Sequence, residues 1–173
     1  ALQQELAVQA QTDVLTGTLN RRSIVQNLQA ALDDPTQTPC VLALDIDFFK
    51  KVNDTHGHQT GDQVLIHFCR TIETMLRKGD LLGRMGGEEF LVVANTLSLA
   101  DAMGLAERIR AAIASTPCLC SPDTPIAITT SVGVAQPHVG ETMEQLLERA
   151  DEALYRAKHA GRNRVMMAGA AIA

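Results

Sequence analysis

The stretch LLGRMGGEEFLVVAN, residues 81–95, places two apolar runs on either side of two glycines and two adjacent carboxylates. A Gly-Gly pair tolerates the positive φ angles that a tight hairpin turn requires. The runs LLGRM and FLVVAN have the length and composition of strands. The stretch therefore predicts a β-hairpin whose turn, Gly86-Gly87, presents the carboxylates of Glu88 and Glu89.

The elements around this hairpin indicate the fold class. Apolar residues at helical spacing predict helices over residues 60–77 and 99–114, and the runs CVLALDI from Cys40 and IAITTSVGVA from Ile126 predict strands. From Cys40 to Ala135 the order is βαββαβ. This is the split βαβ arrangement of ferredoxin-like folds, in which the first strand lies centrally in a mainly antiparallel sheet with its helices on one face.

Three more elements flank this core. Apolar spacing predicts helices over residues 20–32 and 143–157, and the run RVMM predicts a short strand over residues 164–167. With these additions the chain is expected to form an α/β fold, more strictly α+β, with a central sheet surrounded by helices.

The first eleven residues, ALQQELAVQAQ, have Leu2 and Leu6 on one helical face. Residues 1–11 are therefore either the end of an upstream signalling helix or coiled coil, or a simple surface helix. The body of the domain then spans residues 12–168, and residues 169–173 form a C-terminal tail.

Composition and charge limit the classes of function. With 173 residues and 46% hydrophobic content, the chain can bury one sizeable core. Its formal net charge of -5 argues against broad binding to nucleic acid or to an anionic membrane, so any phosphate site must be local. The apolar runs are far shorter than the roughly 18 residues that suggest a membrane span. We therefore expect a soluble, cytoplasmic domain.

The four cysteines are scattered, and only Cys118 and Cys120 lie close together in the chain. Their spacing is not typical of a zinc site. Because a cytosolic domain keeps its thiols reduced, we expect neither zinc nor a disulfide at these positions.

Acidic side chains gather at the end of the first strand and at the hairpin turn. In the predicted sheet, Asp45 and Asp47 come close to Glu88. Carboxylates without a basic partner repel one another unless a hard cation such as Mg²⁺ holds them together. A metal site explains this cluster. The alternative is that these residues are solvated loop acids.

The stretch DIDFFKKVNDTHGHQTGD adds groups that suit a nucleotide. A helical turn from Phe48 presents backbone N–H groups that can cradle phosphate oxygens, and Lys50 supplies mobile positive charge. Asn53, His58 and Asp62 have side chains able to read a base edge.

Asp62 favours guanine over adenine, because a carboxylate accepts from the N1–H and N2–H₂ donors that only guanine has. Each of these residues also has a structural alternative when it is taken singly. Asn53 can be a turn former, His58 a surface residue, and Asp62 an acid favoured by the helix dipole.

Together these stretches resemble the GGDEF-domain family, the diguanylate cyclases. The similarity is carried, in order, by DVLTGTLNRR, DIDFFKKVNDTHGH, RMGGEEF, SVGVA and ADEALYRAKHAGRNRV, and it covers residues 12–165. It implies a fold similar to the palm of nucleotidyl cyclases and polymerases. It also implies condensation of two GTP into cyclic di-GMP with release of two pyrophosphates.

Two positions depart from the family pattern. Glu88 stands where the family name has Asp, and because both acids can ligate Mg²⁺ we expect activity to be retained. Thr18 stands where the pattern has Leu, and we expect only an altered local contact there.

The resemblance implies a role for individual residues. Asp45, the carbonyl of Ile46 and Glu88 would hold Mg²⁺, with Mn²⁺ as the alternative metal. Glu88 would also be the general base for the ribose 3′-hydroxyl, with Glu89 beside it in the catalytic turn. Lys50 would offset the negative charge that grows on the phosphorus during its transfer. The implied substrate-binding residues are Phe48, Phe49, Asn53, His58, Asp62, Gly86, Gly87, Lys158 and Arg162.

A second site is indicated by RKGD, which runs from Arg77 to Asp80. The resemblance implies the family's RxxD inhibitory site, which binds the product with Arg77, Asp80 and Arg108 on the following helix. Arginine can pair bidentately with O6 and N7 of guanine. The alternative is a helix end, in which Arg77 complements the helix dipole and Gly79 forms the cap.

We therefore expect a Mg²⁺-dependent cyclase, the output module of a bacterial signalling protein with an upstream sensory domain. Because each subunit holds one GTP, it should work as a homodimer. One alternative is a binding module that senses GTP or cyclic di-GMP without turnover, which Asp45, Glu88 and Lys50 disfavour. The other is a cyclase that makes an adenine-containing dinucleotide, which Asp62 disfavours.

Overall fold

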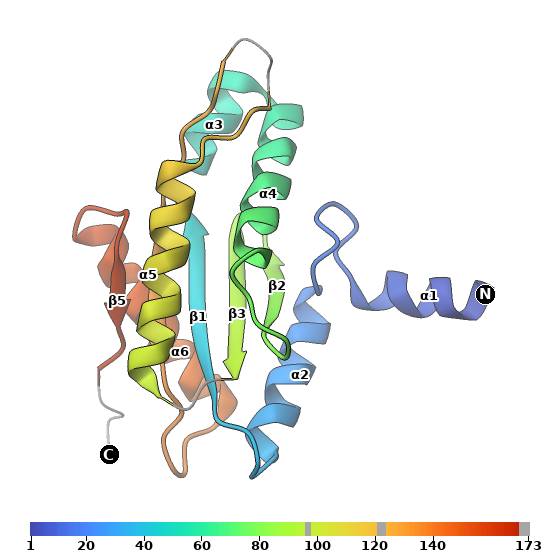
Figure 1. Ribbon diagram of the computed structural model, residues 1–173, viewed down its shortest axis with the longest axis vertical. Helices are drawn as coiled ribbons and strands as arrows, with labels where there is room; N and C mark the ends of the chain where they lie inside the picture. The colour runs from blue at the N-terminus through green and yellow to red at the C-terminus, as the bar shows by residue number, and fades with distance from the viewer. Residues whose placement is uncertain (96–97, 121–123, 170–173) are drawn as a thin grey trace.

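The fold is built around a mainly antiparallel sheet (Figure 1). The computed structural model describes residues 1–95, 98–120 and 124–169. Within them, β1 pairs antiparallel with both β3 and β4, and β5 pairs parallel with β4. The central first strand confirms the predicted fold class. The strands are β1 Pro39–Ile46, β2 Leu81–Gly86, β3 Glu89–Asn95, β4 Thr130–Ala135 and β5 Val165–Met167, in the sheet order β2-β3-β1-β4-β5.

Helices cover both faces of the sheet (Figure 1). The two crossover helices, α4 and α5, pack on one face, as the βαββαβ order predicts. Helices α2 and α6 pack on the opposite face and complete the second half of the core. The helices are α1 Leu2–Gln11, α2 Arg21–Asp33, α3 Phe49–His56, α4 His58–Glu73, α5 Leu99–Ser115 and α6 Met143–His159.

Strand β1 lies between these two layers and is buried along its whole length. Its alternating side chains enter different halves of the core: Leu42 and Leu44 pack with α4 and α5, while Val41 and Ala43 pack with α2 and α6. A strand buried on both faces explains why CVLALDI is a continuous apolar run rather than an alternating one.

Side-chain caps fix where the helices on either side of the sheet begin. Asn20 accepts from the backbone N–H of Ser23 at the start of α2. At the start of α6, Thr142 and Gln145 form a reciprocal capping box. Such caps satisfy N–H groups that have no partner within the helix.

Two predicted boundaries are wrong. The helix predicted over 60–77 spans His58–Glu73. It ends early because the N–H groups of Met75 and Leu76 form tighter i to i−3 hydrogen bonds in place of helical ones, and the chain then turns toward β2. The strand predicted from Ile126 begins only at Thr130, since Ile126 pairs with Cys118 in an isolated bridge outside the sheet.

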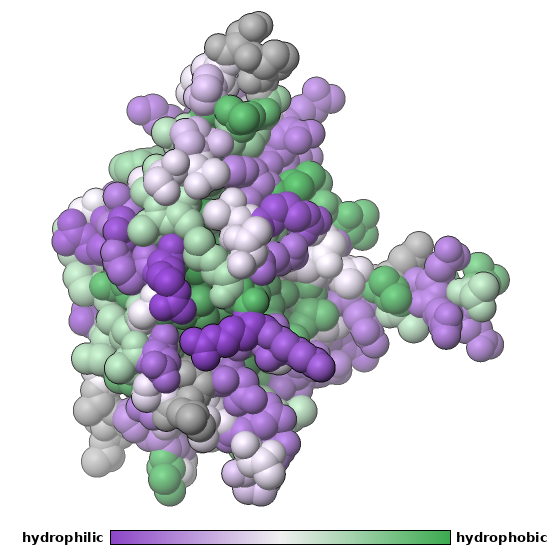
Figure 2. Space-filling view, viewed as in Figure 1, coloured by the Kyte–Doolittle hydropathy of each residue, from purple (hydrophilic) through white to green (hydrophobic). Residues whose placement is uncertain are grey.

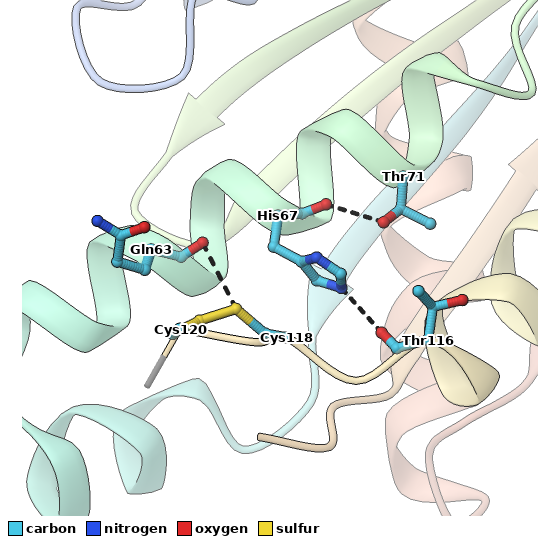
Figure 3. Close-up of a disulfide and its surroundings, with 6 residues drawn as sticks. All are labelled: Gln63, His67, Thr71, Thr116, Cys118 and Cys120. Carbon is cyan, nitrogen blue, oxygen red and sulfur yellow. Dashed lines mark hydrogen bonds between the residues drawn. A yellow bond between two sulfur atoms is a disulfide. The ribbon is translucent and has the colours of Figure 1, made fainter. Parts of the chain in front are cut away.

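The expectation of reduced thiols at Cys118 and Cys120 is also wrong, because the structure joins them in a disulfide (Figure 3). Cys118 exchanges two backbone hydrogen bonds of 2.8 Å with Ile126, which hold it extended. The two cysteine Cα atoms then lie 5.4 Å apart, within the span of a disulfide. The Cys118 sulfur lies 3.9 Å from the carbonyl oxygen of Gln63, so this segment packs on α4.

Helix α1 projects away from the body of the domain (Figure 1). Leu2, Leu6 and Val8 are exposed along it, and Figure 2 shows hydrophobic surface among polar surface on this helix. Whether it is a signalling helix or a simple surface helix stays a prediction. Neither α1 nor any other helix in the described ranges is long and apolar enough to cross a membrane.

Gly133 of β4 should be essential for stability because α6 crosses directly over it. A Cβ at Gly133 would overlap backbone atoms of Ala150 and Leu154. We expect Gly133→Ala to lower the free energy of unfolding, measured by urea denaturation, by about 1–3 kcal/mol. In the control Gly104→Ala, the new Cβ would meet only the flexible end of Arg108, and stability should rise by about 0.5–1 kcal/mol. A Gly133→Ala protein as stable as wild type would contradict this packing.

Candidate active site

The hairpin turn lies beside the end of β1. Gly87 has a φ angle of 51°, in the left-handed region that glycine adopts readily. Arg84 Nε donates to the Gly87 carbonyl oxygen at 2.8 Å, and the N–H of Ile46 donates to the Glu88 carbonyl oxygen at 3.4 Å. These contacts fix Glu88 next to the last residues of the central strand.

Asp45 is a buried carboxylate at this edge of the sheet. Its side chain is 6% exposed, and Lys158 Nζ of α6 donates to it. Burial raises the pKa of Asp45 to about 6; the hydrogen bond and charge of Lys158 oppose this rise, and the charges of Glu88 and Glu89 add to it. The site thus places a buried carboxylate beside two further acidic side chains and one lysine.

A pocket of about 470 Å³ opens at the same edge. It is lined by carboxylates from β1 and the hairpin turn, by the start of α3, and by cations from α3, the end of α6 and the loop after it. Such a lining suits a phosphate-bearing ligand accompanied by a divalent cation. The predicted residues that line it are Asp45, Ile46, Phe48, Phe49, Lys50, Glu88, Lys158 and Arg162.

The phosphate-binding side of the pocket is formed where α3 begins. Phe48 precedes the helix with a φ angle of 55°, and this left-handed turn directs the helix N-terminus at the pocket. N–H groups at a helix N-terminus attract phosphate oxygens. The guanidinium carbon of Arg162 lies 4.4 Å from the centroid of the Phe48 ring, close enough for a cation–π contact.

The groups present fit a divalent cation that arrives with phosphate. Asp45 and Glu88 offer two carboxylates that repel each other, and Ile46 offers a carbonyl oxygen. In the described part of the chain, no set of three or more His, Cys, Asp or Glu side chains is arranged to hold a metal ion. Mg²⁺ typically takes one or two carboxylates and fills its remaining positions with water and substrate phosphates, so two carboxylates suffice.

The predicted base-reading residues lie where α3 meets α4, outside the pocket lining. Asn53 packs against Gly61, where any Cβ would overlap the Asn53 amide. The Oδ1 atom of Asn53 is buried without a hydrogen-bond partner among the described residues. His58 and Asp62 are exposed at the start of α4. The exposed side chains of His58 and Asp62 offer groups that a base could contact, while the Oδ1 atom of Asn53 faces Gly61.

Asp47 does not join the carboxylates of Asp45 and Glu88, contrary to the prediction. Its Oδ1 accepts from Ser131 Oγ at 2.7 Å, and its Oδ2 accepts from Thr129 Oγ1 at 2.7 Å and from the N–H of Asn163 at 2.9 Å. The chain turns after β1, so this carboxylate faces β4 and the loop between α6 and β5. Asp47 therefore lines the pocket, but both of its carboxylate oxygens already accept hydrogen bonds from the protein.

Other residues in and near the pocket differ from the predicted set. Lys51 and Asp54 also line it and were missed, although Asp54 lies one helical turn from Lys50, a spacing that could have indicated it. Glu89 is exposed and lies opposite Asp45 on β3. The turn glycines are exposed and lie outside the lining.

Comparison with known proteins agrees with this geometry. The family model "Diguanylate cyclase, GGDEF domain" matches residues 10–164. The chain belongs to the GGDEF family. Diguanylate cyclase DgcM of Escherichia coli is 41% identical over 175 residues, which cover 96% of this chain and 40% of DgcM. This GGDEF domain therefore spans less than half the length of that relative.

Solved GGDEF structures share its fold. The coiled coil and GGDEF domain of DgcB from Caulobacter crescentus, in complex with c-di-GMP, has a TM-score of 0.89 at 35% identity, covering 96% of this chain and 90% of that one. The active GGEEF domain of a diguanylate cyclase from Vibrio cholerae has a TM-score of 0.79 at 34% identity, and the match covers 88% of this chain and 98% of that one.

In this GGDEF domain the RKGD stretch connects α4 to β2, at the end of β2 away from the hairpin turn. The Asp80 carboxylate accepts from the N–H of Arg77 at 2.8 Å and from the N–H of Asn95 at 3.1 Å. Because α4 ends at Glu73, Arg77 lies beyond the last helical residue. Gly79 has the positive φ angle, 96°, that the helix-end alternative expects. The product site stays a prediction. The side chains of Arg77 and Arg108 are exposed.

Ionisation of Asp45 should destabilise the metal-free GGDEF domain. Its folded-state pKa of about 6 lies above the ordinary value of 3.8. Between these values the folded state binds more protons than the unfolded state, so the free energy of unfolding falls as pH rises through this window. We expect Asp45→Asn to gain stability relative to wild type from about pH 4 to about pH 7, measured by denaturation with a chelator present. A constant difference across this range would contradict the assignment.

Proposed function

We propose that this GGDEF domain condenses two GTP molecules into cyclic di-GMP and releases two pyrophosphates. The observation that carries the proposal is the pocket in which Asp45 and Glu88 lie with Lys50, Lys158 and Arg162. Phosphoryl transfer needs mainly alignment and charge neutralisation, and these residue types supply both. The name of DgcM and the bound c-di-GMP of the DgcB structure support the same activity.

In the proposed reaction, the 3′-hydroxyl of one GTP attacks the α-phosphorus of the other, and the bond to the β-phosphate oxygen breaks as pyrophosphate leaves. Glu88 takes the hydroxyl proton as general base. Lys50 offsets the negative charge that grows at phosphorus, while Lys158, Arg162 and the N–H groups at the start of α3 hold the triphosphate. The same transfer with the two nucleotides exchanged closes the ring.

The metal of this reaction would be Mg²⁺, with Mn²⁺ as the alternative, bound by Asp45, Glu88 and the carbonyl of Ile46. When bound, it neutralises charge on the phosphate oxygens. The hydrogen bond from Lys158 to the Asp45 carboxylate supports a preference for positive charge at this position.

Selection of guanine is proposed for Asn53, His58 and Asp62. Support comes from the exposed side chains of His58 and Asp62 at the start of α4, because the Asp62 carboxylate can accept from base N–H donors. We further propose that two domains meet face to face as a homodimer, because each holds one GTP. An upstream sensory segment that continues from α1 would fit the length of DgcM beyond the matched region.

Replacing Glu88 tests the proposed chemistry. Glu88→Gln keeps the shape of the side chain and removes its charge, so product formation from GTP and Mg²⁺ should fall by about a hundredfold or more. The product is identified by chromatography and mass, and folding is checked by circular dichroism. Glu148→Gln, on the exposed side of α6, is the matched control and should retain full activity. Cyclic di-GMP formation by Glu88→Gln at the wild-type rate would remove Glu88 from the mechanism. If the wild-type protein bound GTP but made no product, the alternative of a binding module that senses the nucleotide would be favoured.

We also propose that Arg77, Asp80 and Arg108 form a product site that inhibits the enzyme. Support comes from the exposure of both arginines and from the position of RKGD at the end of β2 away from the hairpin turn. Asp80 also has a structural role, because its carboxylate oxygens accept hydrogen bonds from two backbone N–H groups. Substitution of Asp80 would therefore mix stability with binding, and Arg77 is the sharper position to test.

Arg77→Ala should weaken binding of cyclic di-GMP by about 1–3 kcal/mol, because one bidentate guanine contact is lost, while the initial rate is maintained. Calorimetric titration of product into wild type and variant measures the loss. Lys78→Ala is the control: it removes a neighbouring exposed cation that cannot pair bidentately, and it should bind product as wild type does. Equal affinities of wild type and Arg77→Ala would show that the product binds elsewhere.

A further inference from the structure

Asp47 has a contact pattern that the proposed chemistry leaves unused. The residue is 5% exposed, and its carboxylate joins three donors from two places far apart in the sequence: the hydroxyls of Thr129 and Ser131 and the N–H of Asn163. We call this set the Asp47 clamp. It ties the loop that follows β1 to the loop between α6 and β5, and residues of both loops line the pocket.

Backbone strain is concentrated at this clamp. In the described part of the chain, the non-glycine residues with positive φ are Phe48 at 55°, Arg162 at 62° and Asn163 at 45°. Phe48 follows Asp47 directly in the chain. Asn163 is itself part of the clamp, and Arg162 precedes it directly. A left-handed conformation is unfavourable for an L-residue, and it persists only where the surroundings enforce it. Asp47 connects both strained loops, because it precedes Phe48 in the chain and accepts from the N–H of Asn163.

The clamp also determines where Arg162 lies. The backbone of Arg162 is held by its N–H, which donates to Ala157 at 3.0 Å, and by its carbonyl oxygen, which accepts from Arg164 Nε at 3.0 Å. The next N–H is the one bound by Asp47. With its backbone fixed on both sides, Arg162 places its guanidinium over Phe48, the other residue adjacent to the clamp.

A second contact holds Asn163 from the side of α5. The Oδ1 atom of Asn163 accepts from Arg110 at 2.8 Å, and Arg110 is itself paired with Glu107 at 2.6 Å. The side chain and the backbone of Asn163 are thus bound to different elements. This double attachment fixes the residue that directly follows Arg162.

We propose that Asp47 is a positioning residue that pre-orders the triphosphate-binding groups by holding the Phe48 and Arg162 loops in their strained conformations. It acts through these neighbours and does not touch substrate. The inference rests on the proposed function, since it assumes that Phe48 and Arg162 bind phosphate. Loss of the clamp should weaken ground-state binding of GTP, which raises KM and leaves kcat nearly unchanged.

The test compares Asp47→Ala, Asp47→Asn and Ser131→Ala. We expect Asp47→Ala to raise KM for GTP by about tenfold with kcat within about twofold. Asp47→Asn should restore most of the affinity, because its carbonyl oxygen still accepts from Asn163 while its amide donates to Ser131. Ser131→Ala removes a hydroxyl from the other carboxylate oxygen and keeps the Asn163 bond, so it should lower stability without changing KM.

Asn163→Pro provides a second variant if Asp47→Ala does not fold. Asn163 is exposed, and proline removes its N–H and forbids its positive φ, so the same rise in KM is expected without a change in the core. Amide hydrogen exchange of Asn163, measured by NMR without nucleotide, should accelerate by about tenfold or more in Asp47→Ala.

These measurements separate the clamp from the proposed function. A wild-type protein that makes no cyclic di-GMP would overturn the function alone, because amide exchange and calorimetric GTP binding still test the clamp. A wild-type KM in the folded Asp47→Ala or Asn163→Pro protein would overturn the clamp. So would a KM in Ser131→Ala or Asp47→Asn as high as that of Asp47→Ala.

Discussion

The structure depends on the burial of one strand, β1, between two layers of helices and between two other strands. Its backbone groups are paired on both sides and its side chains fill both halves of the core, so its end cannot move without disturbing the whole domain. The chain places Asp45 at that end. Burial disfavours the ionised carboxylate there, and this raises its pKa to about 6. A group that is costly to ionise in a fixed position is suited to a cation partner.

The close packing of α6 against the sheet supplies one such partner. Gly133 has no side chain, so the backbone of α6 at Ala150 and Leu154 approaches β4 directly. One turn further along, Lys158 reaches the Asp45 carboxylate from the last turn of the helix. A larger residue at Gly133 would move the helix outward and carry Lys158 with it. Core packing and site electrostatics are therefore set by the same helix position.

The sequence predicts those parts of the fold that depend on residues close together in the chain. Apolar periodicity and the glycine turn reveal β1, the hairpin and their order, and the motifs reveal the groups that line the pocket. The partners of Asp47 could not be predicted, because Thr129 and Asn163 lie 82 and 116 positions away. Periodicity carries no information on which distant donor a carboxylate meets. The disulfide was missed for a different reason: its two cysteines are only two positions apart, but we expected reduced thiols because a cytosolic domain keeps them so.

Both edges of the sheet are protected against further pairing. Along the outer side of β2, the N–H of Leu19 donates to the carbonyl oxygen of Leu82 at 3.1 Å, and the N–H of Arg84 donates to the carbonyl oxygen of Leu19 at 2.8 Å. At the other edge, β5 has only three residues. A long open edge is a template on which another chain can add a strand, as in domain swapping or fibril growth. The covered edge of β2 and the shortness of β5 therefore leave little open strand on which a second chain could pair.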